Sequence, residues 1–219
     1  MTIQAKRLLT ALEIEEIFKI FSVANPKPKG ELIYQNPYTL LIAVVLSAQA
    51  TDKSVNKATA ALFAVASSSQ DMVALGEQKL REYIKTIGLY NSKAKNIWLL
   101  SQKLLTDFQG KVPANRQQLE ELPGVGRKTA NVVLNIVFGE PTIAVDTHVF
   151  RVANRTGLAL AATPSLVEEM LGEGVPHAYQ QSAHHWLILH GRYVCKARKP
   201  DCQRCSIKDI CQYPDKTAK

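Results

Sequence analysis

The stretch LEELPGVGRKTA, residues 119–130, decides how this chain folds. Pro123 ends one helix, and Gly124 and Gly126 allow a tight turn before a second helix begins. No β-strand pattern precedes the two glycines, which argues against a dinucleotide-binding turn. The sequence therefore predicts a helical hairpin whose turn can receive a phosphate at the N-terminus of the second helix.

This helix–P-G-x-G–helix segment, about residues 115–138, resembles the helix-hairpin-helix motif of DNA-binding proteins. Such a motif holds a duplex by its backbone and does not read its sequence. We therefore expect the turn to contact DNA through Gly124, Val125, Gly126 and Arg127.

Helical spacing of apolar residues continues outward from the hairpin in both directions. No segment shows the period-two alternation of a β-hairpin, so the predicted fold class is all-α with short connections. Glycines such as Gly88, Gly139 and Gly172 are expected to separate the helices. The predicted helices lie at about residues 8–21, 38–46, 51–66, 71–75, 77–87, 92–108, 115–121, 127–138, 147–155, 164–171 and 178–190.

The composition bounds the possible partners. The chain has 219 residues, with 27 Lys and Arg against 19 Asp and Glu, and a net charge of +8. This length accommodates one large or two modest domains. The positive excess points to a polyanion, either nucleic acid or a membrane surface. No run approaches the roughly 18–20 apolar residues of a membrane span. The N-terminus has no apolar signal core, so we expect a reducing compartment in which disulfides are rare.

All four cysteines lie in one short segment with the spacing C-x6-C-x2-C-x5-C: Cys195, Cys202, Cys205 and Cys211. Four converging thiolates suit a metal or iron–sulfur centre, because soft sulfur ligands satisfy iron and zinc. Zinc remains a rival, although four-cysteine zinc sites usually contain two short C-x2-4-C pairs and only Cys202 and Cys205 are so paired. The spacing favours a [4Fe–4S] cluster over zinc, and disulfides come last.

Basic side chains crowd around these cysteines, opposed only by Asp201 and Asp209. They are Arg192, Lys196, Arg198, Lys199, Arg204 and Lys208. We expect this loop to contact phosphates, with Arg192 and Lys199 among the contacts. The nearby histidines at 184, 185 and 190 alternate with apolar residues, which suits buried core histidines better than zinc ligands.

Lys128 and Asp146 are the candidate catalytic pair. Arg127 and Lys128 fall in the first turn of a helix, where the dipole disfavours cations, and a broken local rule at a turn points to function. A lysine amine held in its neutral form is a nucleophile suited to Schiff-base chemistry. Phosphate binding alone also explains both cations.

Asp146 follows an apolar run and is expected to cap the helix after it. Its carboxylate could also stabilise positive charge developing on a sugar.

Taken together, the motifs resemble the endonuclease III family over roughly residues 30–213. They are LPGVGRKTAN at 122–131, VDTH at 145–148, LSAQATD at 46–52, HWLILHGR at 185–192 and the cysteine loop. The segment 157–176 has no comparable match, and it looks like a loop with a surface helix.

The resemblance implies two helical domains. Residues 30–140 would form a six-helix module with the hairpin. Residues 1–29 and 141–219 would form the second domain, with a [4Fe–4S] loop at 195–211, and DNA would lie in the cleft between the two. By the same resemblance, Lys128 is the nucleophile and Asp146 the catalytic aspartate. Gln49 would enter the duplex where the damaged nucleotide leaves, and Leu89 would wedge the opposite strand.

The function implied is that of a bifunctional DNA glycosylase and AP lyase of base excision repair. It would remove oxidised pyrimidines of the thymine glycol type and cleave 3′ to the abasic site by β-elimination. We expect a monomer that is cytoplasmic and nucleoid-associated, with damaged double-stranded DNA as its partner and no membrane association. Two alternatives are weaker. Adenine glycosylases typically lack the lysine at 128 and carry an additional C-terminal domain, while a non-enzymatic DNA-binding module would use Lys128 and Asp146 only for contact and folding.

Overall fold

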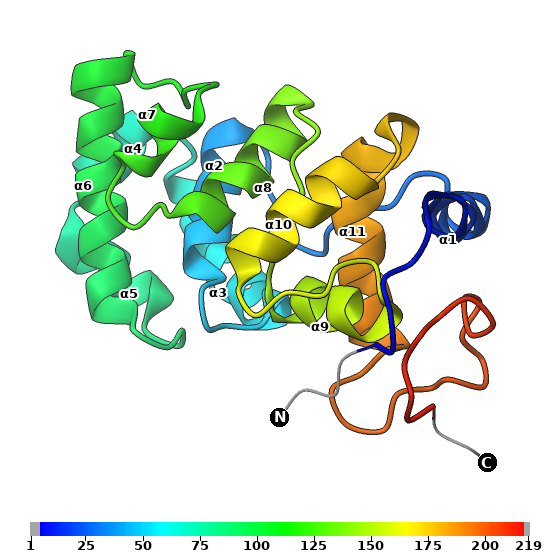
Figure 1. Ribbon diagram of the computed structural model, residues 1–219. Helices are drawn as coiled ribbons and strands as arrows, with labels where there is room; N and C mark the ends of the chain where they lie inside the picture. Colours follow the sequence, from blue (N-terminus) through cyan, green and yellow to red (C-terminus); the bar gives the residue numbers. More distant parts are fainter. Residues whose placement is uncertain (1–4, 217–219) are drawn as a thin grey trace. The chain divides into compact units, whose positions relative to one another are not determined.

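The computed structural model describes residues 5–216. Within that range the regular elements are all α-helices and there is no strand, which confirms the predicted all-α class. The chain divides into two compact units (Figure 1). One is the continuous segment Glu31–Gly139, and the other combines the chain up to Gly30 with the chain from Glu140 onward. No helix in the described range is long and apolar enough to cross a membrane.

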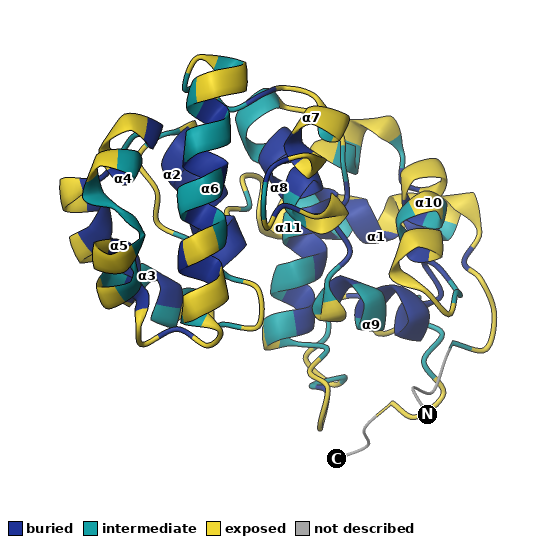
Figure 2. Cartoon of the chain, turned by 90° about the vertical axis from the view of Figure 1, so that its left-hand side faces the viewer, coloured by how far each residue is buried: buried dark blue, intermediate teal, exposed yellow. Residues whose placement is uncertain are grey.

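The continuous unit is built around one fully buried helix. From Tyr38 to Leu46 every residue of α2 is buried, because α3, α6 and α8 all pack against it (Figure 2). Asn36 caps the start of α2 by accepting from the N–H of Thr39 at 2.9 Å. The helices of this unit are α2 (Pro37–Leu46), α3 (Asp52–Val65), α4 (Ser69–Leu75), α5 (Glu77–Ile84), α6 (Tyr90–Phe108), the five-residue α7 (Arg116–Glu120) and α8 (Arg127–Phe138).

The second unit packs around an aromatic cluster. Its helices are α1 (Ala11–Ala24), α9 (Thr147–Thr156), α10 (Pro164–Gly174) and α11 (His177–Tyr193). Phe18 is fully buried and contacts the rings of Phe21, Tyr179 and Trp186. The indole N–H of Trp186 donates to the carbonyl of Asn25 at 2.8 Å, which fixes the end of α1 on α11. From residue 194 to 216 the chain forms a loop without helices.

The first helix starts later than its apolar spacing predicts. Leu8 and Leu9 precede α1, because Thr10 is its N-cap and forms a capping box with Glu13. The N–H of Leu9 instead donates to the carbonyl of Gly157 at 2.9 Å.

Two later boundaries also differ from the prediction. Gly172 lies inside α10, which continues to Gly174, so it does not end the helix. Similarly, α11 runs on to Tyr193 through Gly191. A Cβ on Gly191 would lie 2.9 Å from the Cβ of His148, so the glycine allows α9 and α11 to approach closely.

Gly157 offers a test of this packing. It adopts φ +89°, and a Cβ there would lie 2.5 Å from the carbonyl oxygen of Arg7. We expect Gly157→Ala to lower the free energy of unfolding by clearly more than the ~1–2 kcal/mol that left-handed backbone alone costs. Gly139→Ala is the matched control, since Gly139 has φ +71° and open space around it. Equal losses for the two variants in chemical denaturation would contradict the steric explanation.

Candidate functional site

The hairpin between α7 and α8 is held by packing as well as by glycine. Val125 is buried, and its N–H donates to the carbonyl of Leu122 at 3.0 Å. Gly124 has φ +80°, and a Cβ there would lie 3.1 Å from Asn96 on α6. Of the predicted contact residues, Val125 therefore anchors the turn in the core, while Gly124 and Gly126 are exposed.

The start of α8 fits an anion. Gly126 is the N-cap in extended conformation, and no side chain caps this helix. The first amides of an α-helix have no intrahelical acceptor, and the dipole favours negative charge there. Arg127 and Lys128 are the first two residues of α8, and both are exposed. A phosphate at this end would meet amides and cations together.

Asp146 is the N-cap of α9, as predicted. One of its carboxylate oxygens, Oδ1, accepts from the N–H groups of His148 and Val149, each at 2.8 Å. The residues before it, 143–145, are buried, and the Nδ1 of His184 lies 2.9 Å from the carbonyl oxygen of Ala144. The carboxylate is therefore rigidly placed and half-buried. Lys128 and Asp146 belong to different units of the chain.

Gln49 and Leu89 share a rare backbone conformation. Their φ angles are +53° and +59°, which non-glycine residues seldom adopt. Both side chains are exposed, and Leu89 is 59% exposed although it is large and apolar. A Cβ on Gly88 would lie 3.9 Å from the carbonyl oxygen of Gln49, so the two loops are neighbours. The structure thus brings these two predicted residues together. Backbone strain at exposed residues points to a function for them.

Lys93 is a residue of this region that sequence reasoning missed. It lies near the start of α6 and is buried, with its Nζ donating to the carbonyls of Leu46 and Ala48 at 2.9 and 2.6 Å. Burial lowers the pKa of its ammonium group. The helical period could have revealed it, because Lys93 shares a face with the buried residues Ile97 and Leu100.

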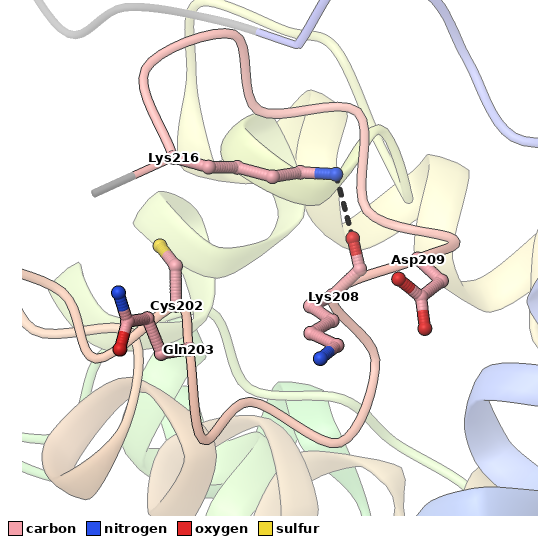
Figure 3. Close-up of a pocket in the computed structure, with 5 residues that line it drawn as sticks. All are labelled: Cys202, Gln203, Lys208, Asp209 and Lys216. Atoms are coloured by element: carbon pink, nitrogen blue, oxygen red, sulfur yellow. Dashed lines mark hydrogen bonds between the residues drawn. The ribbon is translucent and has the colours of Figure 1, made fainter. Parts of the chain in front are cut away.

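The cysteine loop contains all four cysteines, and none of them forms a disulfide in the structure. Figure 3 shows part of this loop, with Cys202 and the lysines at 208 and 216 lining a pocket of about 450 Å³. The Nζ of Lys216 donates to the carbonyl of Lys208 at 2.6 Å, which folds the end of the described chain back onto the loop.

The donor set fits an iron–sulfur cluster. The pKa of Cys205 is raised to about 11, chiefly by burial and also by the charges of the other three cysteines nearby. Thiolates in such a place require a strong positive charge, which cluster iron supplies when bound. Among residues 5–216, no three His, Cys, Asp or Glu side chains converge on one metal-ion site.

Two arginines of α9 support this loop. Arg155 is buried and donates to the carbonyls of Lys196 and Ala197 at 2.7 and 3.0 Å. Its Nη1 lies 3.8 Å from the sulfur of Cys195, and its buried Nε has no protein partner among the described residues. Arg151 donates to the carbonyl of Cys195 at 3.0 Å. The arginines thus fix the first half of the loop.

The predicted phosphate contacts around the loop differ in position. Arg192 is partly buried in the last turn of α11, and Lys199 is exposed with φ +50°. His190 is buried in that same turn, and its Nε2 lies 3.7 Å from the sulfur of Cys205. Burial lowers the pKa of His190 to about 4. A neutral imidazole leaves the positive charge of the loop to its exposed lysines and arginines.

Known protein families and relatives match this chain over most of its length. Residues 42–177 match the HhH-GPD superfamily of base excision DNA repair proteins, and residues 195–211 match the iron-sulfur binding domain of endonuclease III. Endonuclease III of Rickettsia conorii is 60% identical over 91% of this chain and 95% of its own length. Endonuclease III of Escherichia coli K12 is 55% identical over 97% of this chain and 98% of its own. The chain belongs to the endonuclease III family.

Solved structures agree with this assignment. A trapped covalent intermediate of endonuclease III with DNA has a TM-score of 0.88 and 43% identity, covering 94% of this chain and 97% of the other. A thermostable thymine-DNA glycosylase has a TM-score of 0.80 and 26% identity, covering 94% and 95%. The chain is thus a DNA glycosylase and AP lyase that binds DNA, and its cofactor is a [4Fe–4S] cluster.

The role of Arg155 in holding the cluster loop can be tested by cluster loss. Arg155→Met removes the donors to two carbonyls of the loop, and unsatisfied groups of this kind cost ~1–3 kcal/mol each. We expect the visible absorbance of the cluster to decay at least several-fold faster in the presence of an iron chelator. Arg198→Met, which changes an exposed arginine of the same loop, should leave the rate unchanged. Identical decay in both variants would show that Arg155 does not hold the loop.

Proposed function

We propose that this enzyme removes oxidised pyrimidines, such as thymine glycol, from duplex DNA and then cleaves the strand through a Schiff base on Lys128. The observation that carries the proposal is the position of Lys128. It is exposed in the first turn of a helix that no side chain caps, directly after a glycine turn suited to phosphate. A nucleophile placed there lies beside the sugar whose phosphate the turn holds.

In the proposed reaction, the amine nitrogen of Lys128 attacks C1′ with its lone pair and gives up a proton, and the glycosidic C–N bond breaks. The base leaves with the bonding electron pair and takes up a proton. The C1′–O4′ bond then breaks, O4′ takes up a proton, and a protonated imine forms between Lys128 and C1′. Loss of a C2′ proton lets the C3′–O bond break, so the 3′ phosphate departs with its electron pair. Water then hydrolyses the imine and restores the lysine.

Asp146 would support the first step. Positive charge develops on the sugar as the base leaves, and a fixed carboxylate lowers the energy of that state. The two amide bonds at the start of α9 hold the carboxylate in one orientation through Oδ1. In this proposal the other carboxylate oxygen, Oδ2, faces the substrate.

Base extrusion and DNA seating complete the proposal. The reacting carbon and the base cannot be reached inside an intact stack, so the damaged nucleotide must leave the duplex. Gln49 would fill the space it vacates and Leu89 would wedge the opposite strand. The backbone would be held by Gly124, Gly126 and Arg127 in the hairpin, with Val125 as its anchor, and by Arg192 and Lys199 beside the cluster loop.

We further assign the four cysteines of residues 195–211 as the cluster ligands, and the enzyme as a monomer. In this assignment the cluster is structural. It orders a loop that has no helix, so that its exposed cations face the DNA backbone.

The nucleophile is tested by borohydride trapping on a duplex that contains thymine glycol. We expect the wild type to form a covalent adduct and Lys128→Gln to form none, with binding of the damaged duplex retained. Arg127→Gln is the matched control, because it removes the neighbouring cation but not the proposed nucleophile. A covalent adduct formed by Lys128→Gln would show that another amine is the nucleophile. If the wild type binds the damaged duplex but forms no adduct, the protein is a monofunctional glycosylase or a binding module.

The two roles of Asp146 can be separated by two substitutions. Asp146→Asn keeps a good N-cap, so the melting temperature should hardly change, while base release should fall by at least ~100-fold. Asp146→Ala should lose the same activity and also ~1 kcal/mol of stability, the usual cost of a lost cap. Single-turnover base release and thermal unfolding measure the two effects. Full activity in Asp146→Asn would reduce Asp146 to a cap.

A further inference from the structure

One buried lysine connects the two loops that carry Gln49 and Leu89. The Nζ of Lys93 donates to the carbonyls of Leu46 and Ala48, the latter one residue before Gln49. The backbone N–H of Lys93 donates to the carbonyl of Leu89 at 3.1 Å. That main-chain bond is the ordinary first hydrogen bond of α6, so Lys93 lies in the first turn of the helix that follows Leu89, and its side chain holds the loop that leads to Gln49.

Part of this arrangement has a purely structural explanation. Leu46 ends α2, and the carbonyls at the end of a helix lack intrahelical partners and carry partial negative charge. A lysine there is a favourable cap. Helix capping alone, however, does not explain the backbone conformations of Gln49 and Leu89.

The conformation of the two neighbouring loops goes beyond capping. Gln49 and Leu89 both adopt left-handed backbone, and both expose their side chains. Such conformations persist only where surrounding contacts enforce them. The side-chain bonds of Lys93 fall at positions 46 and 48, directly before Gln49, and Lys93 itself lies in the helix turn directly after Leu89. The two loops also lie next to each other, because a Cβ on Gly88 would lie 3.9 Å from the carbonyl oxygen of Gln49.

We propose that Lys93 is a positioning residue for base extrusion, which fixes Gln49 and Leu89 next to each other so that both enter the duplex together. This inference rests on the roles assigned to Gln49 and Leu89 in the proposed function. It assigns Lys93 no contact with DNA and no part in the bond-breaking steps. Its contribution belongs to the step in which a paired nucleotide leaves the stack.

The test compares two duplexes that differ only in the cost of extrusion. In one, thymine glycol is paired with adenine; in the other, it lies opposite an abasic-site analogue, so no partner base must be separated from it. We expect Lys93→Met to slow single-turnover base release from the paired duplex by about tenfold or more, because both carbonyl bonds are lost. Release from the unpaired duplex should fall by less than about threefold. Lys95→Met, at an exposed lysine of the same helix, should affect neither.

Two further variants keep the test decisive. Lys93→Gln retains a donor that can reach one carbonyl and should give an intermediate defect on the paired duplex; it also serves if Lys93→Met does not fold. In a Gln49→Gly background, Lys93→Met should cost less than in the wild type, since the side chain to be positioned is absent. Equal losses on both duplexes, or full additivity with Gln49→Gly, would overturn the role of Lys93. Wild-type enzyme that releases no base from either duplex would instead overturn the proposed function.

Discussion

Buried cations in this chain donate to backbone carbonyls of loops instead of pairing with carboxylates. Lys93 does so for the loop after α2, and Arg155 for the start of the cysteine loop. A buried cation is costly unless it is hydrogen-bonded, and an unsatisfied buried carbonyl is costly as well. Each of these contacts satisfies both groups at once, so it holds its loop firmly. Removal of either cation leaves its carbonyls unpaired, so each loop is sensitive to the substitution of a single residue.

The loops held in this way carry the functions assigned to the chain. Irregular backbone gains little order from its own hydrogen bonds, and it needs contacts from rigid elements to keep one conformation. Here those contacts come from α6 in one unit and from α9 in the other. The same two helices thus belong to the hydrophobic core and also hold the loops in place. In each of them, buried apolar residues fix the helix, and a long cationic side chain reaches from that fixed base to the loop.

The sequence predicts much of this structure, and its failures have identifiable causes. The hairpin and the Asp146 cap follow from local chemistry, so the residues alone predict them. Leu9 is buried but not helical, because the Thr10–Glu13 capping box starts the helix after it. Gly191 does not end its helix, because the glycine is needed for the close approach of His148 from another helix. The roles of Lys93 and Arg155 depend on partners 45 and 41 residues away in the chain, which periodicity cannot identify.

The proposed catalytic groups lie at similar places, in the first turn of one helix and at the N-cap of another. Lys128 and Asp146 each lie at the start of a helix, α8 and α9 respectively. The positive end of a helix dipole disfavours an ammonium group and favours a carboxylate. The proposed chemistry needs a neutral amine to attack and an anion to face the developing positive charge. Both proposed groups are therefore held by the regular start of a helix and not by an irregular loop.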